Sequence, residues 1–126
     1  MKNKIIWLVM LGIFSVGILQ AQLRKIPADV TDAFKTKYPD ATNVEWKDNL
    51  SSFRASFIRK GDSYTASFNN KGEWLETEEK IEQDDLPKDV KKGFSKSRFA
   101  DREVTEVVKI EKKEGETQYR LLTKKK

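Results

Sequence analysis

The sequence predicts an α+β fold with two layers, in which two helices pack on one face of an antiparallel sheet of about six strands. Three observations predict it. A motif typical of a helix start occurs twice, and the residues after each copy alternate between apolar and polar side chains. The 126 residues also include seven Phe, three Tyr and three Trp, which supply the large apolar side chains that a core needs.

The helix-start motif is a segment at 26–34 that recurs at 86–94, with Pro, Asp, Val and Phe identical and Ile replaced by Leu. Proline is favoured at the first helical position because its missing N–H would be unpaired there in any case. The Asp of the motif lies in the first turn, where the helix dipole favours a negative charge. The repeat therefore predicts an internal duplication, with units at about 26–81 and 86–124 and the order α-β-β-β-β then α-β-β.

The first helix has one apolar stripe and a defined end. Val30, Phe34 and Tyr38 recur every four residues, so they share a face. Pro39 ends the helix because it disfavours the helical conformation of the residue before it. The second copy carries the equivalent Val and Phe, and Gly93 weakens that helix by about 1 kcal/mol relative to Ala.

After the first helix the apolar period changes from 3.6 to 2, which is typical of half-buried strands in an antiparallel sheet. The short segments between the runs contain Asn, Asp and Gly, as hairpin turns do. Strands are predicted at 44–47, 53–58, 63–68, 73–80, 104–112 and 118–123.

The alternation also divides the sheet into two faces. We expect the aromatic side, which includes Val44 and Trp46, to be buried under the helices, because burial of one such side chain is worth about 1.5–3 kcal/mol. The other face is polar, rich in small residues and open, so a partner can bind there. Its expected members are Glu45, Lys47, Arg54, Ser56, Ile58, Thr65, Ser67, Arg120 and Leu122.

Residues 1–21 have the features of a secretory signal peptide. Two lysines precede an uncharged run of 15 residues, 5–19, which is short for a spanning helix and suits the apolar region of a signal. Cleavage is expected after Ala21, with Gly17 as the alternative site, and an uncleaved anchor is the other interpretation. The sequence thus predicts a periplasmic or secreted protein, with residues 22–126 as a single domain.

The residue types present exclude most catalytic chemistry. The chain has no Cys and no His, so it lacks thiolate zinc sites, cysteine nucleophiles and Ser-His triads. None of its eight Ser has a Lys three positions later, as a Ser-Lys nucleophile would. We therefore expect no enzyme activity, no catalytic residue, no cofactor and no metal. The acidic stretch 73–85 leaves one alternative open, a cation site formed by Glu82, Asp84 and Asp85.

The charge balance does not favour nucleic acid. The chain has 25 Lys and Arg against 20 Asp and Glu, so it is a mixed polyelectrolyte rather than a basic one. Basic residues gather toward the C-terminus and acids in 73–85, which indicates either solvated faces or a dipolar surface that steers a charged partner. The expected partner is a protein or peptide, with no nucleic acid and no membrane contact after the signal is removed.

Four residues are the candidate contact patch: Arg54, Ile58, Trp74 and Leu75. Adjacent residues of a strand point to opposite faces, so one of the pair Trp74 and Leu75 must lie on the open face. Tryptophan is enriched in interface hot spots. Whichever of the two lies there is expected to join Arg54 and Ile58.

Three motifs resemble those of the PepSY-like family of exported bacterial proteins. They are Ile-Pro-x-x-Val-x-x-x-Phe-x-x-x-Tyr-Pro at 26–39, Val-x-Trp at 44–46 and Gly-x-Trp-Leu-Glu-Thr-Glu at 72–78. The resemblance implies a fold like that of the β-lactamase inhibitory protein, built by duplication, and a periplasmic location. It implies no particular activity. The second copy departs from the pattern, with Arg98-Phe99 in place of Tyr38-Pro39.

Together these observations predict an exported, non-enzymatic binding module that presents an open sheet face to a protein or peptide. A narrower form of the prediction, drawn from the resemblance, is an inhibitor of a periplasmic hydrolase. The alternative is a small-ligand or cation binder in envelope homeostasis.

Overall fold

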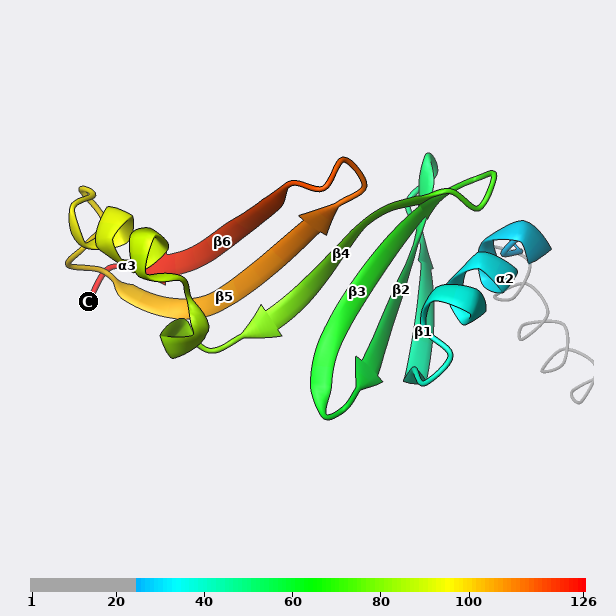
Figure 1. Ribbon diagram of the computed structural model, residues 1–126, viewed down its shortest axis with the longest axis horizontal. Helices are drawn as coiled ribbons and strands as arrows, with labels where there is room; N and C mark the ends of the chain where they lie inside the picture. The colour runs from blue at the N-terminus through cyan, green and yellow to red at the C-terminus, as the bar shows by residue number, and fades with distance from the viewer. Residues whose placement is uncertain (1–24) are drawn as a thin grey trace, which may run out of the picture.

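The computed structural model describes residues 25–126, so the predicted signal peptide lies outside the described residues (Figure 1). Within these residues, two α-helices and six strands form the predicted α+β fold. Their order is α2 (Ala28–Lys37), β1 (Thr42–Asp48), β2 (Ser52–Arg59), β3 (Asp62–Asn69), β4 (Trp74–Ile81), the 3-10 turn η1 (Gln83–Asp85), α3 (Lys88–Ser95), β5 (Glu103–Lys112) and β6 (Thr117–Lys124).

The six strands form one antiparallel sheet in chain order, β1-β2-β3-β4-β5-β6. Every neighbouring pair is joined by a short hairpin except β4 and β5, between which η1 and α3 intervene. Figure 1 shows α2 against the β1–β3 part of the sheet and α3 beside β5 and β6 at the opposite end. The two helices are therefore far apart, because α2 precedes β1 at one end of the sheet and α3 lies in the connection to β5 at the other end.

Both helices begin one residue later than the motif predicts. Pro27 and Pro87 are the residues that precede the first helical turn, in extended conformation, and the carbonyl of Pro27 accepts the backbone N–H groups of Val30 and Thr31. Proline suits this position because its fixed φ is already compatible with the turn. The first helix ends at Lys37, directly before Tyr38 and Pro39, as predicted.

The core lies between α2 and the first three strands. The ring of Phe34 lies within 5.0–6.3 Å, centroid to centroid, of the rings of Tyr38, Trp46, Phe57 and Phe68. Such tilted and edge-to-face contacts add to the stabilisation that burial alone gives. The buried residues of this cluster are Val30, Phe34, Tyr38, Phe53, Ala55, Phe57, Ala66 and Phe68.

The second half of the chain is covered less well than the sequence suggested. No residue of α3 is buried, and Val90 and Phe94, the expected stripe, are half-buried. The buried apolar residues of β5 lie outside the α2 cluster, with Val107 on one face of the sheet and Val108 on the other. The apolar interior is thus concentrated around α2.

The expectation that Val44 is buried is wrong, because its side chain is 37% exposed. The cause is a bulge in β1. Asn43 has a φ of 54°, and the register with β2 shifts between Thr42 and Glu45. Val44 still lies on the α2 side, where it lines a hollow with Phe34 and Trp46, and Trp46 packs against the core as expected.

Candidate functional site: the open face of the sheet

The strand pairing places all nine residues predicted for the open face on the side of the sheet opposite α2. Arg54 pairs with Lys47 and Ser67, and these positions alternate with the buried Phe53 and Ala55. Counting across the remaining pairs extends this face to Glu76, Glu78 and Lys80 of β4, Glu106, Val108, Ile110 and Lys112 of β5, and Arg120 and Leu122 of β6.

The centre of the open face is an Arg–Glu–Arg cluster. The carboxylate of Glu78 on β4 accepts one hydrogen bond from Arg54 on β2 at 2.5 Å and forms an ion pair with Arg120 on β6 at 2.9 Å. Each arginine therefore reaches across one intervening strand. On the β3 side this is possible because Thr65 and Ser67 are small, and Ser67 is itself buried.

The cluster is partly shielded from water. The Glu78 side chain is 13% exposed, although no helix covers it, because long charged side chains lie over the sheet around it. Among the described residues, Arg54 Nε is a buried nitrogen with no hydrogen-bond acceptor. This N–H is therefore a buried donor that no described residue satisfies, and leaving such a donor unpaired costs free energy.

Further ion pairs continue the alternation of charge along this face. Lys112 lies 3.6 Å from Glu76, and Lys80 lies 3.1 Å from Glu106. Exposed pairs of this kind each contribute about 0–1 kcal/mol to stability. Their larger effect is to fix the position of charges on a surface that is otherwise free of covering elements.

A hollow of about 130 Å³ lies beside the cluster. Two apolar side chains lie toward the same ends of the strands on the open face. Ile58 is 36% exposed and Leu122 is 44% exposed. The face thus combines fixed charges with two exposed aliphatic groups. The hollow is lined by Ser63, Thr65, Glu78, Lys80, Glu106, Val108 and Arg120.

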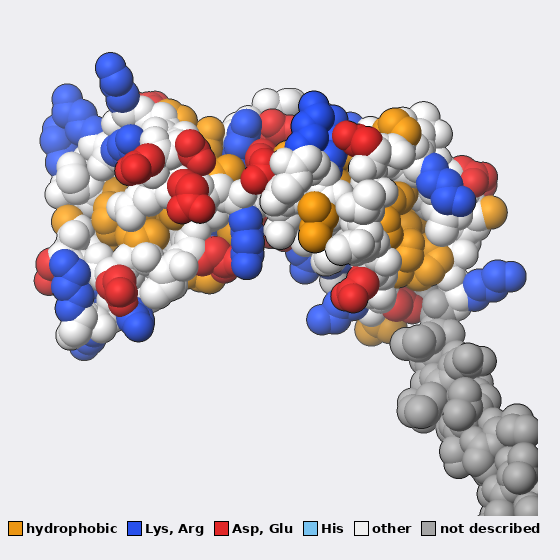
Figure 2. Space-filling model, turned by 90° about the horizontal axis from the view of Figure 1, so that it is seen from below, with side chains coloured by type: hydrophobic (Ala, Val, Ile, Leu, Met, Phe, Trp, Pro, Cys, Tyr) orange, Lys and Arg blue, Asp and Glu red, His pale blue; other side chains and the backbone are white. Residues whose placement is uncertain are grey.

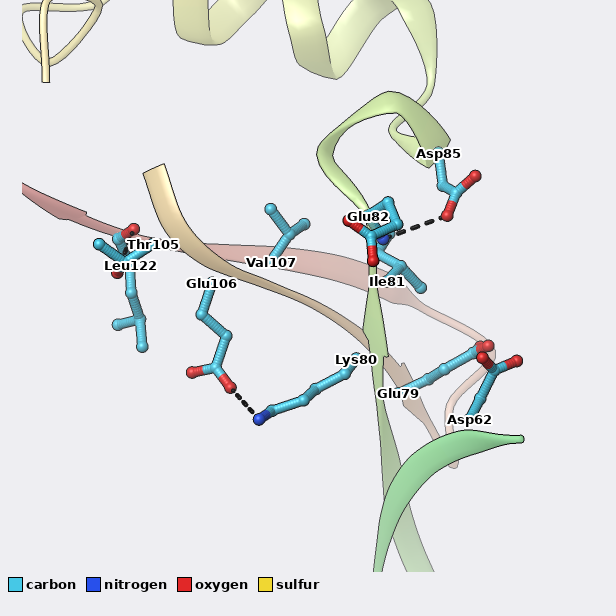
Figure 3. A pocket seen from close by; sticks show the side chains of 10 residues that line it. All are labelled: Asp62, Glu79, Lys80, Ile81, Glu82, Asp85, Thr105, Glu106, Val107 and Leu122. Carbon is cyan, nitrogen blue, oxygen red and sulfur yellow. Dashed lines mark hydrogen bonds and ion pairs between the residues drawn. The ribbon is translucent and has the colours of Figure 1, made fainter. Parts of the chain in front are cut away.

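A larger hollow of about 540 Å³ lies where the end of β4 meets η1 and the start of β3. Figure 3 shows the ion pair between Lys80 and Glu106 on one side of it and Asp62 on the other. The carboxylates of Glu82 and Asp85 each accept a hydrogen bond from the backbone N–H of the other residue, which forms a capping box in the turn η1. Across the part of the chain that the structure describes, no three His, Cys, Asp or Glu side chains are grouped so that they could hold a metal ion.

The structure does not bring the four predicted contact residues together. Arg54 and Ile58 both lie on the open face of β2. Trp74 pairs with Phe68 on the helix-covered face, donates from Nε1 to Thr77 Oγ1 at 2.8 Å and lies under the Lys37 ammonium, which is 4.0 Å from its ring. The cause is a bulge between the pairs of Ser67 and Phe68. Leu75 is the additional residue there, so alternation does not decide its face.

Glu78 is the central residue that the sequence interpretation missed. Its period-2 neighbours on β4 are charged as well, and the whole stretch 73–85 was interpreted as a solvated acidic run. The available signal was the alternation itself, which places Glu76, Glu78 and Lys80 on one face of a strand. The alternation does not show that β2 and β6 each lie two strands away from β4, on opposite sides of it, and Glu78 meets the two arginines only because of that strand order.

The pKa shifts occur on the opposite face and at the rim. Burial raises the pKa of the Tyr38 phenol, with a smaller opposing effect from its hydrogen bond to Thr77. Burial also raises the pKa of Tyr64, and the nearby carboxylate of Glu79 adds to that rise. The Tyr38 hydroxyl links the end of α2 to Thr77 on β4, and the Tyr64 hydroxyl on β3 donates to Glu79 on β4.

Fold and face together define a two-layer α+β protein whose uncovered sheet face is a charged platform. The family model described as "Putative beta-lactamase-inhibitor-like, PepSY-like" matches residues 51–125, and the chain belongs to this family. No curated protein matches the chain significantly. None of the helices within residues 25–126 has the length and apolar character to cross a membrane.

Solved structures from Bacteroides share the fold. A BLIP-like protein of Bacteroides fragilis is 24% identical with a TM-score of 0.74, over 84% of this chain and 77% of that one. A DUF2874 family protein of Bacteroides uniformis is 24% identical with a TM-score of 0.75, over 79% and 72%. A protein of Bacteroides eggerthii described as a putative periplasmic protein is 24% identical with a TM-score of 0.76, over 81% and 74%.

Proposed function

We propose that this chain is an exported, non-enzymatic protein that binds a protein or peptide partner through the open face of its sheet. The observation that carries the proposal is the Arg54–Glu78–Arg120 cluster at the centre of a face that no helix covers. Arginine is enriched in interface hot spots, and a guanidinium already held in place loses little conformational freedom on binding. The exposed Ile58 and Leu122 provide apolar contacts near these charges.

The export part of the proposal is supported by the apolar run at 5–19 and by the likeness to a protein described as periplasmic. The non-enzymatic part is supported by the absence of Cys and His from the sequence and by the family description. The expected mature protein begins at Gln22. Mass spectrometry of the protein recovered from an expressing cell tests the cleavage, and a mass that retains residues 1–21 would contradict it.

Site-specific photo-crosslinking tests the binding face. A photoreactive amino acid at Ser56, which is exposed on the open face, is expected to capture a partner in the native envelope. The same group at Asp32, which is exposed on α2, is the matched control and is expected to capture none. Equal capture from both positions, or from Asp32 alone, would contradict the proposed face.

The variant Arg54→Glu tests the cluster itself. A carboxylate in place of Arg54 would repel Glu78 and reverse the charge offered to the partner, so crosslinking from Ser56 should be lost. Thermal unfolding of the variant shows whether its fold is retained. Undiminished capture of the same partner by a folded Arg54→Glu protein would contradict a role for the cluster.

The narrower proposal is that the partner is a hydrolase that the chain inhibits. Its support is the family description and the shared fold, together with a rigid platform that could cover an active-site opening. The test adds increasing amounts of the mature protein to periplasmic extract and measures hydrolase activities, β-lactamase among them. Loss of one activity with wild type but not with Arg54→Glu is expected, and unchanged activities throughout would contradict inhibition.

A further inference from the structure

The charges of the described chain are divided unevenly between its two ends. Residues 88–103 and 124–126 carry nine Lys and Arg against three Asp and Glu, and we call them the basic end. The other described residues carry 13 Lys and Arg against 17 Asp and Glu. The segments of the basic end are therefore net positive and the other described residues net negative, although Asp84 of η1 lines a hollow together with Lys91 of α3.

The fold gathers these two segments. The C-terminus lies beside α3, at the end of the sheet farthest from α2 (Figure 1). A shallow hollow there is lined by Arg98, Asp101, Arg102, Lys125 and Lys126, so the loop after α3 and the C-terminal residues meet. Figure 2 shows Lys and Arg side chains projecting at this end of the molecule.

Most of these cations are not neutralised. Lys124 forms an ion pair with Glu103 at 3.2 Å, whereas the other lysines of the basic end form none with another described residue. Lys91, Lys96 and Lys125 are all exposed. The hollow at this end also contains the carboxylate of Asp101, and the other charges spread over a helix, a loop and a chain end, so the basic end suits a broad negative surface better than one small anion.

Phe99 adds an apolar group to the same end. Its side chain is 36% exposed, and the guanidinium groups of Arg98 and Arg102 lie 4.8 and 5.1 Å from its ring centroid. Aromatic and arginine side chains are common at the boundary between lipid headgroups and acyl chains, where the ring contacts the acyl chains and the guanidinium groups contact the headgroups. A soluble polyanion offers negative charges but no apolar region in which an exposed phenyl ring could be buried.

We propose that the basic end docks on the surface of a bilayer that contains anionic phospholipid, with Phe99 entering the headgroup boundary. The acidic remainder of the molecule is repelled by the same surface. The protein would then stand on the membrane with α3 and the C-terminus down and the α2 half away from it. The sequence alone led us to expect no membrane contact after removal of the signal, because it does not place the C-terminal lysines next to α3.

Vesicle sedimentation tests the proposal with the mature protein from Gln22, which retains every described residue. Wild type is expected to bind phosphatidylcholine vesicles that contain phosphatidylglycerol, to bind pure phosphatidylcholine far less, and to be released by salt. Equal binding to both vesicles, or to neither, would overturn the proposal. Stronger binding to soluble dextran sulfate than to the anionic vesicles would overturn it in favour of a polyanion.

Matched variants localise the effect. Neutralising Lys96, Lys125 and Lys126 to Gln is expected to weaken vesicle binding about 100-fold, at about 5-fold per lysine. The control changes Lys35, Lys60 and Lys71 to Gln, which alters the net charge equally but at the other end, and should bind nearly as wild type does. An equal loss in both variants would show that net charge alone acts and would overturn the docking surface.

The variant Phe99→Ala distinguishes insertion of the phenyl ring into the bilayer from electrostatic attraction to the anionic lipids. It keeps every charge and is expected to weaken binding about 10-fold, with the residual binding released by salt as before. Thermal unfolding of each variant establishes that it is folded. Unchanged affinity of a folded Phe99→Ala protein would overturn the insertion of the ring.

Discussion

Thr77 connects the end of α2 to β4 and also binds Trp74 within β4, through one hydroxyl group. It lies buried on β4, 2.6 Å from the Tyr38 hydroxyl at the end of α2, and accepts the indole N–H of Trp74 at 2.8 Å. Thr77→Val would leave both of these groups without their partner, at about 1–3 kcal/mol for each buried group left unsatisfied. Tyr38→Phe removes one hydrogen bond and should cost about 1 kcal/mol. Urea unfolding measures the free energy of unfolding of both variants, and we expect the larger decrease for Thr77→Val. A larger decrease for Tyr38→Phe would contradict this prediction.

Gly72 is required for two separate reasons. Its φ of 87° is strained for any other residue, and a Cβ there would lie 2.5 Å from the backbone oxygen of Asp29 in α2. Gly61, with a φ of 85° and no atom near its Cβ position, is the matched control. Gly61→Ala should cost about 1–2 kcal/mol from the backbone alone, and Gly72→Ala measurably more. Equal losses in thermal unfolding would show that the approach of α2 to this turn is unimportant.

The two tyrosines with raised pKa values predict alkaline instability. Burial raises the pKa of Tyr38 and of Tyr64 in the folded protein above the ordinary value of 10.0. The folded state therefore holds these protons more tightly than the unfolded state does. Their contribution to the free energy of unfolding is complete below about pH 10 and is lost as the pH rises through the folded pKa values. Urea unfolding across this range checks the fall, and Tyr64→Phe should make it shallower.

At the scale of elements, α3 is the weakest part of the fold. It has eight residues, none of them buried, and Gly93 lies in its interior with open space around its Cβ position. Gly93→Ala should therefore stabilise the helix by about 0.5–1 kcal/mol. Hydrogen exchange checks this, because the amides of α3 should exchange up to about 5-fold more slowly in the variant. Unchanged or faster exchange would contradict the expectation.

The strands and helices were predictable because the signals for them are local. The duplicated motif located both helices to within a residue, and the alternation located all six strands. The exposure of Val44 was predicted wrongly, and the choice between Trp74 and Leu75 was left open; both positions lie at bulges. A bulge adds one residue to a strand and shifts all later side chains by one position. Asn43 suits its positive φ, but Asn is also common in ordinary turns, and Leu75 carries no such signal.

Across the whole molecule, stability should fall from the α2 end to the α3 end. Phe53 and Phe68 on β2 and β3 are almost fully buried, whereas α3 has no buried residue and β6 is an edge strand. We expect the amides of β2 and β3 to exchange only through global unfolding, and those of α3 and β6 through smaller openings. Native-state hydrogen exchange with increasing denaturant measures both. Equal free energies of opening along the chain would contradict a core concentrated around α2.

The sequence by itself determined the helices, the strands and the two faces of the sheet, because periodicity and turn residues act over a few positions. Only the tertiary structure decided which distant residues meet. Arg54, Glu78 and Arg120 lie on three strands whose neighbours depend on the path of the chain, and alternation cannot supply that path. The basic end likewise exists because β6 returns the C-terminal lysines to α3. A charge acts through distance in space, so its partners follow from the folded chain.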